Sequence, residues 1–145
     1  MPNRELFKAA VVLAVFVALS ALLASKFYGE ERVLKNIRTE YSKIETLQNA
    51  AVLKPEIFVN RLTFSYGHSE FSTPLPKESV LAFHDREFLS KGWTSGGSQG
   101  ASSHVYCKSS LSAVVEVFSS TDQQSKYLVD ISSGGVNSQF CAPKG

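Results

Sequence analysis

The chain has 145 residues with 15 Lys or Arg and 13 Asp or Glu, so its formal net charge is only +2. Four residues near the N-terminus account for that excess: Arg4, Lys8, Lys26 and Glu5. The remaining 12 basic and 12 acidic residues balance, and they form no basic cluster that could neutralise phosphates. Nucleic acid is therefore excluded as an expected partner, and the length indicates one small domain.

The segment from Ala9 to Ser25 is uncharged, and Ser20 is its only internal polar residue. At about 1.5 Å per residue it would be roughly 26 Å long, and the flanking lysines can snorkel to extend it. This pattern predicts a transmembrane signal anchor over residues 9–26, after a cytoplasmic leader over residues 1–8. The lipid bilayer would then be one partner.

A cleaved signal peptide is the alternative interpretation of the same segment. Ala18 and Ser20 would supply small residues before a cut, but the cut would leave the apolar sequence ALLAS on the mature chain. This outcome favours an uncleaved anchor.

Two arguments about orientation disagree. Two basic residues precede the apolar segment and five follow it closely, which by the positive-inside rule would place the C-terminal side in the cytoplasm. The short basic leader and the two cysteines favour the opposite orientation, with the domain in an oxidising compartment. We expect a single-pass protein of the bacterial inner membrane with its domain in the periplasm, and the lack of an N-x-S/T sequon agrees with this.

Residues 27–54 are predicted to continue as an amphipathic stalk helix that ends before Pro55, because proline disfavours a helical residue before it. Apolar side chains recur in this helix at the spacing of one heptad seam: Leu34, Ile37, Tyr41 and Ile44. The stripe could lie on the chain's own domain, or it could be a seam for a partner helix.

Residues 55–135 are predicted to form a small extracytoplasmic α+β domain. The patterns indicate a strand over 57–66 that ends at Gly67-His68-Ser69, a helix over 77–91, and three further strands over 105–108, 111–118 and 126–132. One helix packed on an antiparallel sheet of about four strands, in the order β-α-β-β-β, satisfies them. Residues 136–145 would be a polar tail.

Cys107 lies in a predicted strand and Cys141 in the tail. A disulfide between them would fasten the tail to the sheet, and closing a loop of this length would stabilise the fold by about 3 to 4 kcal/mol. Two unrelated thiols are the alternative. The oxidising compartment favours the disulfide.

Gly96-Gly97-Ser98-Gln99-Gly100 matches the G-x-S-x-G motif of the hydrolase nucleophile elbow. The predicted context differs, because a helix precedes the motif and no acidic residue lies between Ser98 and His104, the only later histidine. We therefore interpret it as a flexible Gly/Ser loop. A catalytic pairing of a free cysteine with a histidine conflicts with the disulfide, and no catalytic residue is predicted.

The three histidines are far apart in the sequence and have no Cys or carboxylate at metal-ligand spacing: His68, His84 and His104. No metal and no cofactor is predicted. His84 lies on the apolar face of the predicted helix, where a buried and hydrogen-bonded imidazole is expected, and His68 is predicted to be a turn residue.

The order of anchor, stalk helix, antiparallel sheet and C-terminal disulfide is similar to the layout of type IV pilins and pseudopilins. Those families begin with a leader that ends in Gly, followed by a Phe-Thr-Leu-x-Glu-like sequence, where this chain has Arg4-Glu5-Leu6-Phe7-Lys8. A second helix also precedes most of the predicted sheet. The resemblance therefore implies neither leader processing nor filament assembly.

These features predict a membrane-anchored, non-enzymatic accessory or scaffold subunit of a membrane protein assembly, with protein partners at its helix and domain. An anchored ligand-binding or sensing module is the alternative. That function needs a pocket, and the residues expected to line it are aromatic: Phe58, Phe64, Tyr66 and Trp93.

Overall fold

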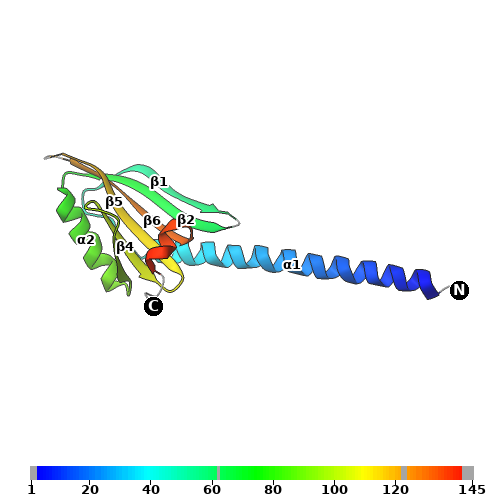
Figure 1. Ribbon diagram of the computed structural model, residues 1–145. Helices are drawn as coiled ribbons and strands as arrows, with labels where there is room; N and C mark the ends of the chain where they lie inside the picture. Colours follow the sequence, from blue (N-terminus) through cyan, green and yellow to red (C-terminus); the bar gives the residue numbers. More distant parts are fainter. Residues whose placement is uncertain (1–2, 62, 122–123, 142–145) are drawn as a thin grey trace.

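The computed structural model describes residues 3–61, 63–121 and 124–141 (Figure 1). Its described part contains two α-helices, one six-stranded antiparallel sheet and a short 3-10 helix. In chain order the elements are α1 (Asn3–Tyr41), β1 (Ala51–Asn60), β2 (Phe64–Thr73), α2 (Lys77–Ser90), β3 (Thr94–Ser98), β4 (Ser103–Lys108), β5 (Leu111–Thr121), β6 (Gln124–Gly134) and η1 (Val136–Cys141). The strands lie side by side in the order β1-β2-β6-β5-β4-β3.

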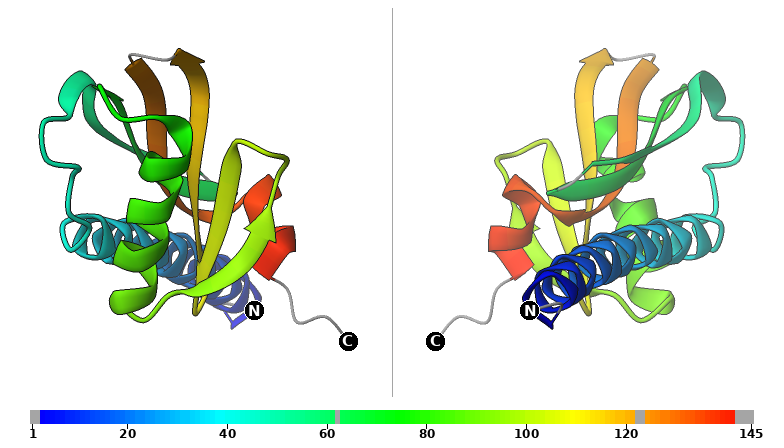
Figure 2. Two further views of the ribbon diagram at one scale, coloured as in Figure 1. Left: turned by 90° about the vertical axis from the view of Figure 1, so that its left-hand side faces the viewer. Right: turned by 90° about the vertical axis from the view of Figure 1, so that its right-hand side faces the viewer.

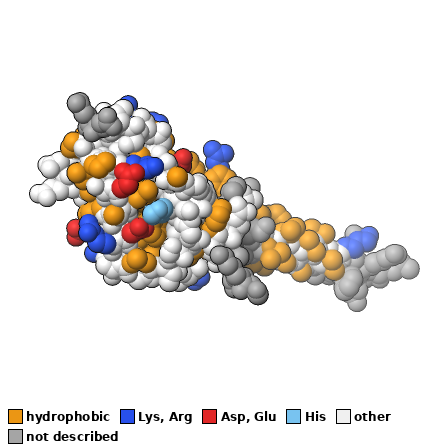
Figure 3. Space-filling model, turned by 60° about the vertical axis from the view of Figure 1, so that its left-hand side comes forward, with side chains coloured by type: hydrophobic (Ala, Val, Ile, Leu, Met, Phe, Trp, Pro, Cys, Tyr) orange, Lys and Arg blue, Asp and Glu red, His pale blue; other side chains and the backbone are white. Residues whose placement is uncertain are grey.

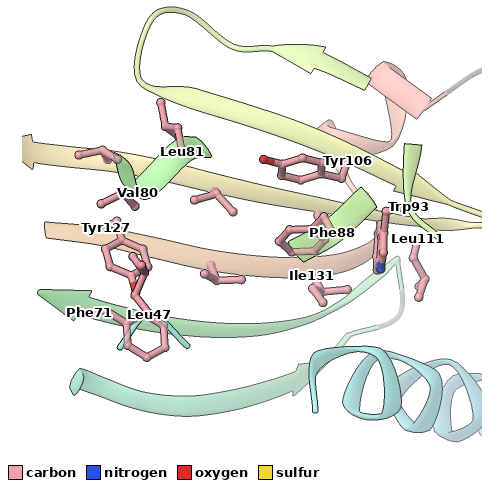
Figure 4. Close-up of a cluster of buried hydrophobic side chains, with 14 of the residues drawn as sticks. Leu47, Phe71, Val80, Leu81, Phe88, Trp93, Tyr106, Leu111, Tyr127 and Ile131 are labelled. Carbon is pink, nitrogen blue, oxygen red and sulfur yellow. The ribbon is translucent and has the colours of Figure 1, made fainter. Parts of the chain in front are cut away.

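One face of the sheet carries the core, beneath α2 and the C-terminal end of α1 (Figures 2 and 4). Alternate residues of β6 point into it, and Tyr127 and Ile131 are completely buried. The Phe88 ring of α2 stacks on Tyr106 of β4 with 4.4 Å between ring centroids. Because α1 and α2 share this face, a single core joins both helices to the sheet.

The opposite face is partly covered by η1, which packs against β4, β5 and β6. The chain reverses after β6 through Gly134 and Gly135, whose φ angles are +76° and +74°. Both angles lie in the left-handed region that glycine adopts without strain. A Cβ at Gly134 would also lie 2.6 Å from the Thr63 carbonyl oxygen, so glycine is required there by space as well.

The prediction of about four strands is wrong, because the sheet has six. The predicted stalk helix would extend to residue 54, but α1 ends at Tyr41 and residues 51–60 form β1. Pro55 lies inside this strand rather than at a helix end. β1 is an edge strand with register shifts on both sides of Lys54, and an edge position tolerates proline because one side of the strand makes no ladder hydrogen bonds.

The second additional strand is β3, in the segment interpreted from its sequence as a flexible loop. It pairs antiparallel with β4, and a register shift between Ser95 and Gly97 marks a bulge. Glycine is needed nearby because a Cβ at Gly96 would lie 2.8 Å from the Cys107 sulfur. Close packing therefore requires Gly96, whereas Gly97 and Gly100 have open space around them and adopt positive φ angles of +106° and +98°.

The predicted end of the first strand at Gly67-His68-Ser69 is also wrong, since all three residues lie within β2. A Cβ at Gly67 would lie 2.6 Å from the Phe58 ring and 3.3 Å from Ile37. Glycine inside a strand often marks such a close approach. At this position the end of α1 contacts the sheet.

The prediction of a transmembrane anchor over residues 9–26 is wrong, and the single-pass inner-membrane localisation that depends on it is wrong as well. Within the described part of the chain, no helix has the length and apolar character needed to cross a bilayer. The uncharged run of the sequence, Ala9 to Ser25, has seventeen residues, whereas a spanning helix needs about 20 apolar residues.

Candidate functional site

The N-terminal part of α1 projects away from the folded domain (Figure 1). Its described apolar segment, residues 11–24, contains nine large apolar side chains that are 46% to 69% exposed: Val11, Val12, Leu13, Val15, Phe16, Val17, Leu19, Leu22 and Leu23. Successive helix positions are rotated by about 100°, so these side chains surround the helix. In Figure 3 hydrophobic atoms cover this projection, with a basic side chain toward its far end.

The single internal polar residue of the apolar segment is satisfied within the helix. The Ser20 hydroxyl donates to the Phe16 carbonyl oxygen at 2.8 Å, one turn earlier. A serine bonded in this way adds little polarity to the helix surface. The apolar segment therefore presents an almost wholly apolar surface.

The C-terminal end of α1 packs on its own domain. Ile37 is completely buried, and Tyr41 and Ile44 pack against the core. The Tyr41 hydroxyl donates to the Val129 carbonyl oxygen at 3.2 Å, and burial raises the pKa of this phenol. Leu34 is half-buried. Contact between these four residues and a partner helix stays a prediction, but Ile37 is already covered by the domain.

Aromatic and charged side chains reinforce this packing. The Phe58 ring of β1 meets Tyr41 edge to face at 5.9 Å and lies 5.0 Å from the Arg38 guanidinium. Lys108 in β4 donates to Glu40 at 2.7 Å. Burial alone would raise the pKa of Glu40, but its hydrogen bonds to Lys108 and Lys43 outweigh this and lower the pKa below its usual value. The end of α1 is thus fixed to both halves of the sheet.

The predicted disulfide between Cys107 and Cys141 is confirmed, and the two residues have a sequence separation of 34. It joins β4 to η1, and so fastens the C-terminal segment to the face of the sheet opposite α2. It also consumes the only two cysteines of the chain.

His84 is buried in α2, as its position on the apolar helix face predicted, and it is only 1% exposed. The expected hydrogen bond is not present, because neither ring nitrogen has a partner among the described groups. The ring instead packs against aromatic neighbours, with its centroid 5.3 Å from that of Tyr127 and 5.1 Å from that of Phe83. Burial lowers the pKa of His84 to about 4, and the nearby Asp85 carboxylate opposes this only in part.

The other two histidines form polar clusters that the sequence did not reveal. His104 Nδ1 lies 2.9 Å from Asp85 Oδ1, which also accepts a 2.7 Å hydrogen bond from the Tyr106 hydroxyl. His68 lies in β2, 3.3 Å from Glu70 and 3.8 Å from Asp130. Each of these contacts depends on strand register or helix placement. The described side chains contain no group of three residues suited to hold a metal ion.

The register of β3 and β4 places Ser98 of the G-x-S-x-G sequence opposite His104. This brings Ser98, His104 and Asp85 into one region although their order in the chain differs from that of a hydrolase. The described contacts include no hydrogen bond between Ser98 and His104, and Ser98 lies on an exposed edge strand rather than on a strand-to-helix turn. The geometry is therefore not that of a nucleophile elbow.

The aromatic residues expected to line a ligand pocket do not converge. Phe58 packs on α1, and Phe64 stacks on Tyr66 at 5.9 Å. Trp93 is buried edge to face against Phe88 at 5.4 Å. The three described cavities are lined by other residues.

Two features of the described structure are therefore candidate sites: the exposed apolar segment of α1, and a small, partly open cavity lined by His84. Comparison of the chain with protein families, with curated proteins and with solved structures finds no match. Function is therefore inferred from the geometry of this chain alone.

The burial of two titratable groups predicts opposite pH dependences of stability. For His84 the folded pKa of about 4 lies below the unfolded value of 6.5, so the unfolded chain binds more protons between these values and stability falls by about 3 kcal/mol on acidification. For Asp130, burial raises the pKa from 3.8 to about 6, so stability rises by a similar amount as the pH falls through that window.

Variants should separate the two effects. Both variants would be unfolded by denaturant at pH 7 and at pH 4.5. When the pH is lowered from 7 to 4.5, we expect the free energy of unfolding of His84→Leu to rise relative to that of Asp130→Asn. Comparing the two variants cancels the contribution of the other carboxylates, including Glu40 and Glu70, whose pKa values are lowered. An identical change of stability with pH in both variants would contradict the prediction.

Proposed function

We propose that the chain is a non-enzymatic accessory or scaffold subunit of a protein assembly, and that the apolar segment of α1 inserts among apolar helices of a partner protein. The observation that carries this proposal is the exposure of large apolar side chains on every side of the projecting helix. A helix that is apolar all round is normally enclosed, and exposed apolar patches of this kind mark interaction sites.

The attachment of α1 to the domain supports a scaffolding role. Its C-terminal end is fixed by the buried Ile37, by the hydrogen bond from Tyr41 to Val129, and by the ion pair between Glu40 and Lys108. A partner that encloses the apolar segment would therefore also hold the sheet in a defined orientation. This arrangement suits a subunit that positions a small domain on a larger assembly.

The experiment compares the native mass of two tagged variants extracted in a mild detergent. In the first variant, four exposed residues on one side of the apolar segment are replaced by glutamine: Val12, Phe16, Leu19 and Leu23. Glutamine retains helix propensity but removes the apolar surface. We expect the wild-type chain to migrate in a discrete complex with other polypeptides, and this variant to migrate without them.

The matched control replaces exposed apolar residues of the domain, Ile57, Leu89 and Phe118, by glutamine. The control should stay in the complex, which would localise the contact to the apolar segment. Persistence of the complex in the helix variant would contradict the proposal. The proposal would also be contradicted if the wild-type chain bound phospholipid vesicles and was extracted with no other polypeptide.

A further inference from the structure

Two buried side chains near the end of α1 have unused hydrogen-bonding groups within the described protein: neither ring nitrogen of His84 is bonded, and the Tyr127 hydroxyl, which lies near the Leu47 backbone N–H, has no acceptor for its proton. The side chains of His84 and Tyr127 are 1% and 0% exposed. Burial of a polar atom without a partner is costly, and most such atoms in folded proteins are bonded to protein or to ordered water. Within the described part of the chain, these groups therefore have unused hydrogen-bonding capacity.

Both side chains line one cavity between α2, the sheet and the connector, defined as residues 42–50, that links α1 to β1. Its volume is about 20 Å³. A cavity holds one water molecule once it exceeds about 10 to 15 Å³, provided that two to four polar groups line it. The size therefore admits one water, and it is far below the roughly 300 Å³ of a typical organic ligand site.

We propose that this cavity binds a single internal water molecule that bridges the His84 imidazole and the Tyr127 hydroxyl. The neutral imidazole offers one donor and one acceptor, and the phenol offers both. One further lining residue, Thr46, carries a hydroxyl group that can complete the coordination of the water, whereas the Tyr41 hydroxyl already donates to the Val129 carbonyl oxygen. The apolar lining from Phe71 and Val129 limits the cavity to this one occupant.

The position of the water gives it a structural role. Ile44, Glu45 and Thr46 of the connector form one wall of the cavity, and Leu47 is 7% exposed within the core. The Glu45 backbone N–H also donates to Glu87 Oε1 in α2 at 3.0 Å, which ties the connector to that helix. The water thus lies where the connector meets α2 and β6, and it helps to hold the end of α1 on the domain.

The test is the detection of long-lived water by rotating-frame NMR on the folded full-length chain. We expect dipolar cross-peaks, whose sign differs from that of exchange peaks, between water and the ring protons of His84 and Tyr127. In Tyr127→Phe, we expect the amides of Glu45 and Leu47 to exchange about five- to tenfold faster. Tyr106→Phe is the matched control, because its hydroxyl donates to Asp85 rather than into the cavity. It should retain the water signals.

Two results would overturn the inference. One is the absence of water cross-peaks at His84 and Tyr127 in a wild-type chain whose other signals show it to be folded. The other is retention of the water cross-peaks at the ring protons of Phe71, which also lines the cavity, in a folded double variant, His84→Leu with Tyr127→Phe. The wild-type measurement stands by itself if the double variant does not fold.

Discussion

Replacing Ile37 with alanine is expected to lower the free energy of unfolding by about 2 to 5 kcal/mol. Ile37 lies near the C-terminal end of α1 and is completely buried against the sheet. Truncation removes the transfer free energy of three carbons and leaves a cavity that the surrounding side chains fill only in part. Urea denaturation of the purified variant would measure the loss.

Loss of this side chain should also release α1 from the domain. Gly67 approaches Ile37 so closely that its missing side chain is part of the contact, and Phe58 packs beside them. Backbone amides between Val33 and Tyr41 should therefore exchange with solvent faster in the variant than amides in β5 and β6.

Ile57→Ala is the matched control, since Ile57 is 47% exposed on β1 and undergoes the same chemical change. It should lower the free energy of unfolding clearly less than the core substitution. Equal effects of Ile37→Ala and Ile57→Ala would contradict the docking of α1.

A pair of glycine substitutions gives a second comparison in the same variant series. Gly67→Ala should destabilise the fold, whereas Gly29→Ala, with nothing within 4 Å of its added methyl group, should stabilise α1 by up to about 1 kcal/mol.

Residue periodicity was sufficient to predict the elements whose pattern agrees with their tertiary role. The helix expected over 77–91 corresponds to α2, and the three strands expected after it correspond to β4, β5 and β6. In these segments core-facing residues recur at the helical or strand period, as in β6, where the buried Tyr127, Val129 and Ile131 alternate with more exposed residues. Local pattern and packing therefore give the same result.

The errors arise where a local signal has more than one structural meaning. Pro55 suggests the end of a helix, but it is equally compatible with an edge strand, and only the pairing with β2 decides between them. Gly67 and Gly96 suggest turns, yet each allows a close approach to a residue distant in sequence. Such contacts are set by tertiary structure and cannot be read from neighbouring residues.

The candidate sites were predictable to different extents. The uncharged run near the N-terminus is evident in the sequence, whereas its exposure on all sides of a projecting helix depends on where the domain ends. The burial of His84 follows from its helix face. Its place beside Tyr127 does not, because 43 positions separate the two residues and only the packing of α2 across β6 joins them.

Reduction of the disulfide between Cys107 and Cys141 is expected to lower the free energy of unfolding by about 3 to 4 kcal/mol. Unfolding the oxidised chain leaves a loop closed between cysteines with a sequence separation of 34, which restricts the unfolded ensemble. Reduction removes this restriction. For a domain of this size the melting temperature should fall by on the order of 10 °C.

Thermal unfolding with and without reductant would measure this effect, and the double variant Cys107→Ser with Cys141→Ser is the control, since reductant should leave its melting temperature unchanged. Because η1 is held by the disulfide and by packing on β4, β5 and β6, its amides should lose protection before those of the sheet. The chain reverses before η1 at two glycines with positive φ, so the native turn itself does not require the covalent bond. An unchanged melting temperature on reduction would show that packing alone holds η1, and would refute the stabilising role of the disulfide.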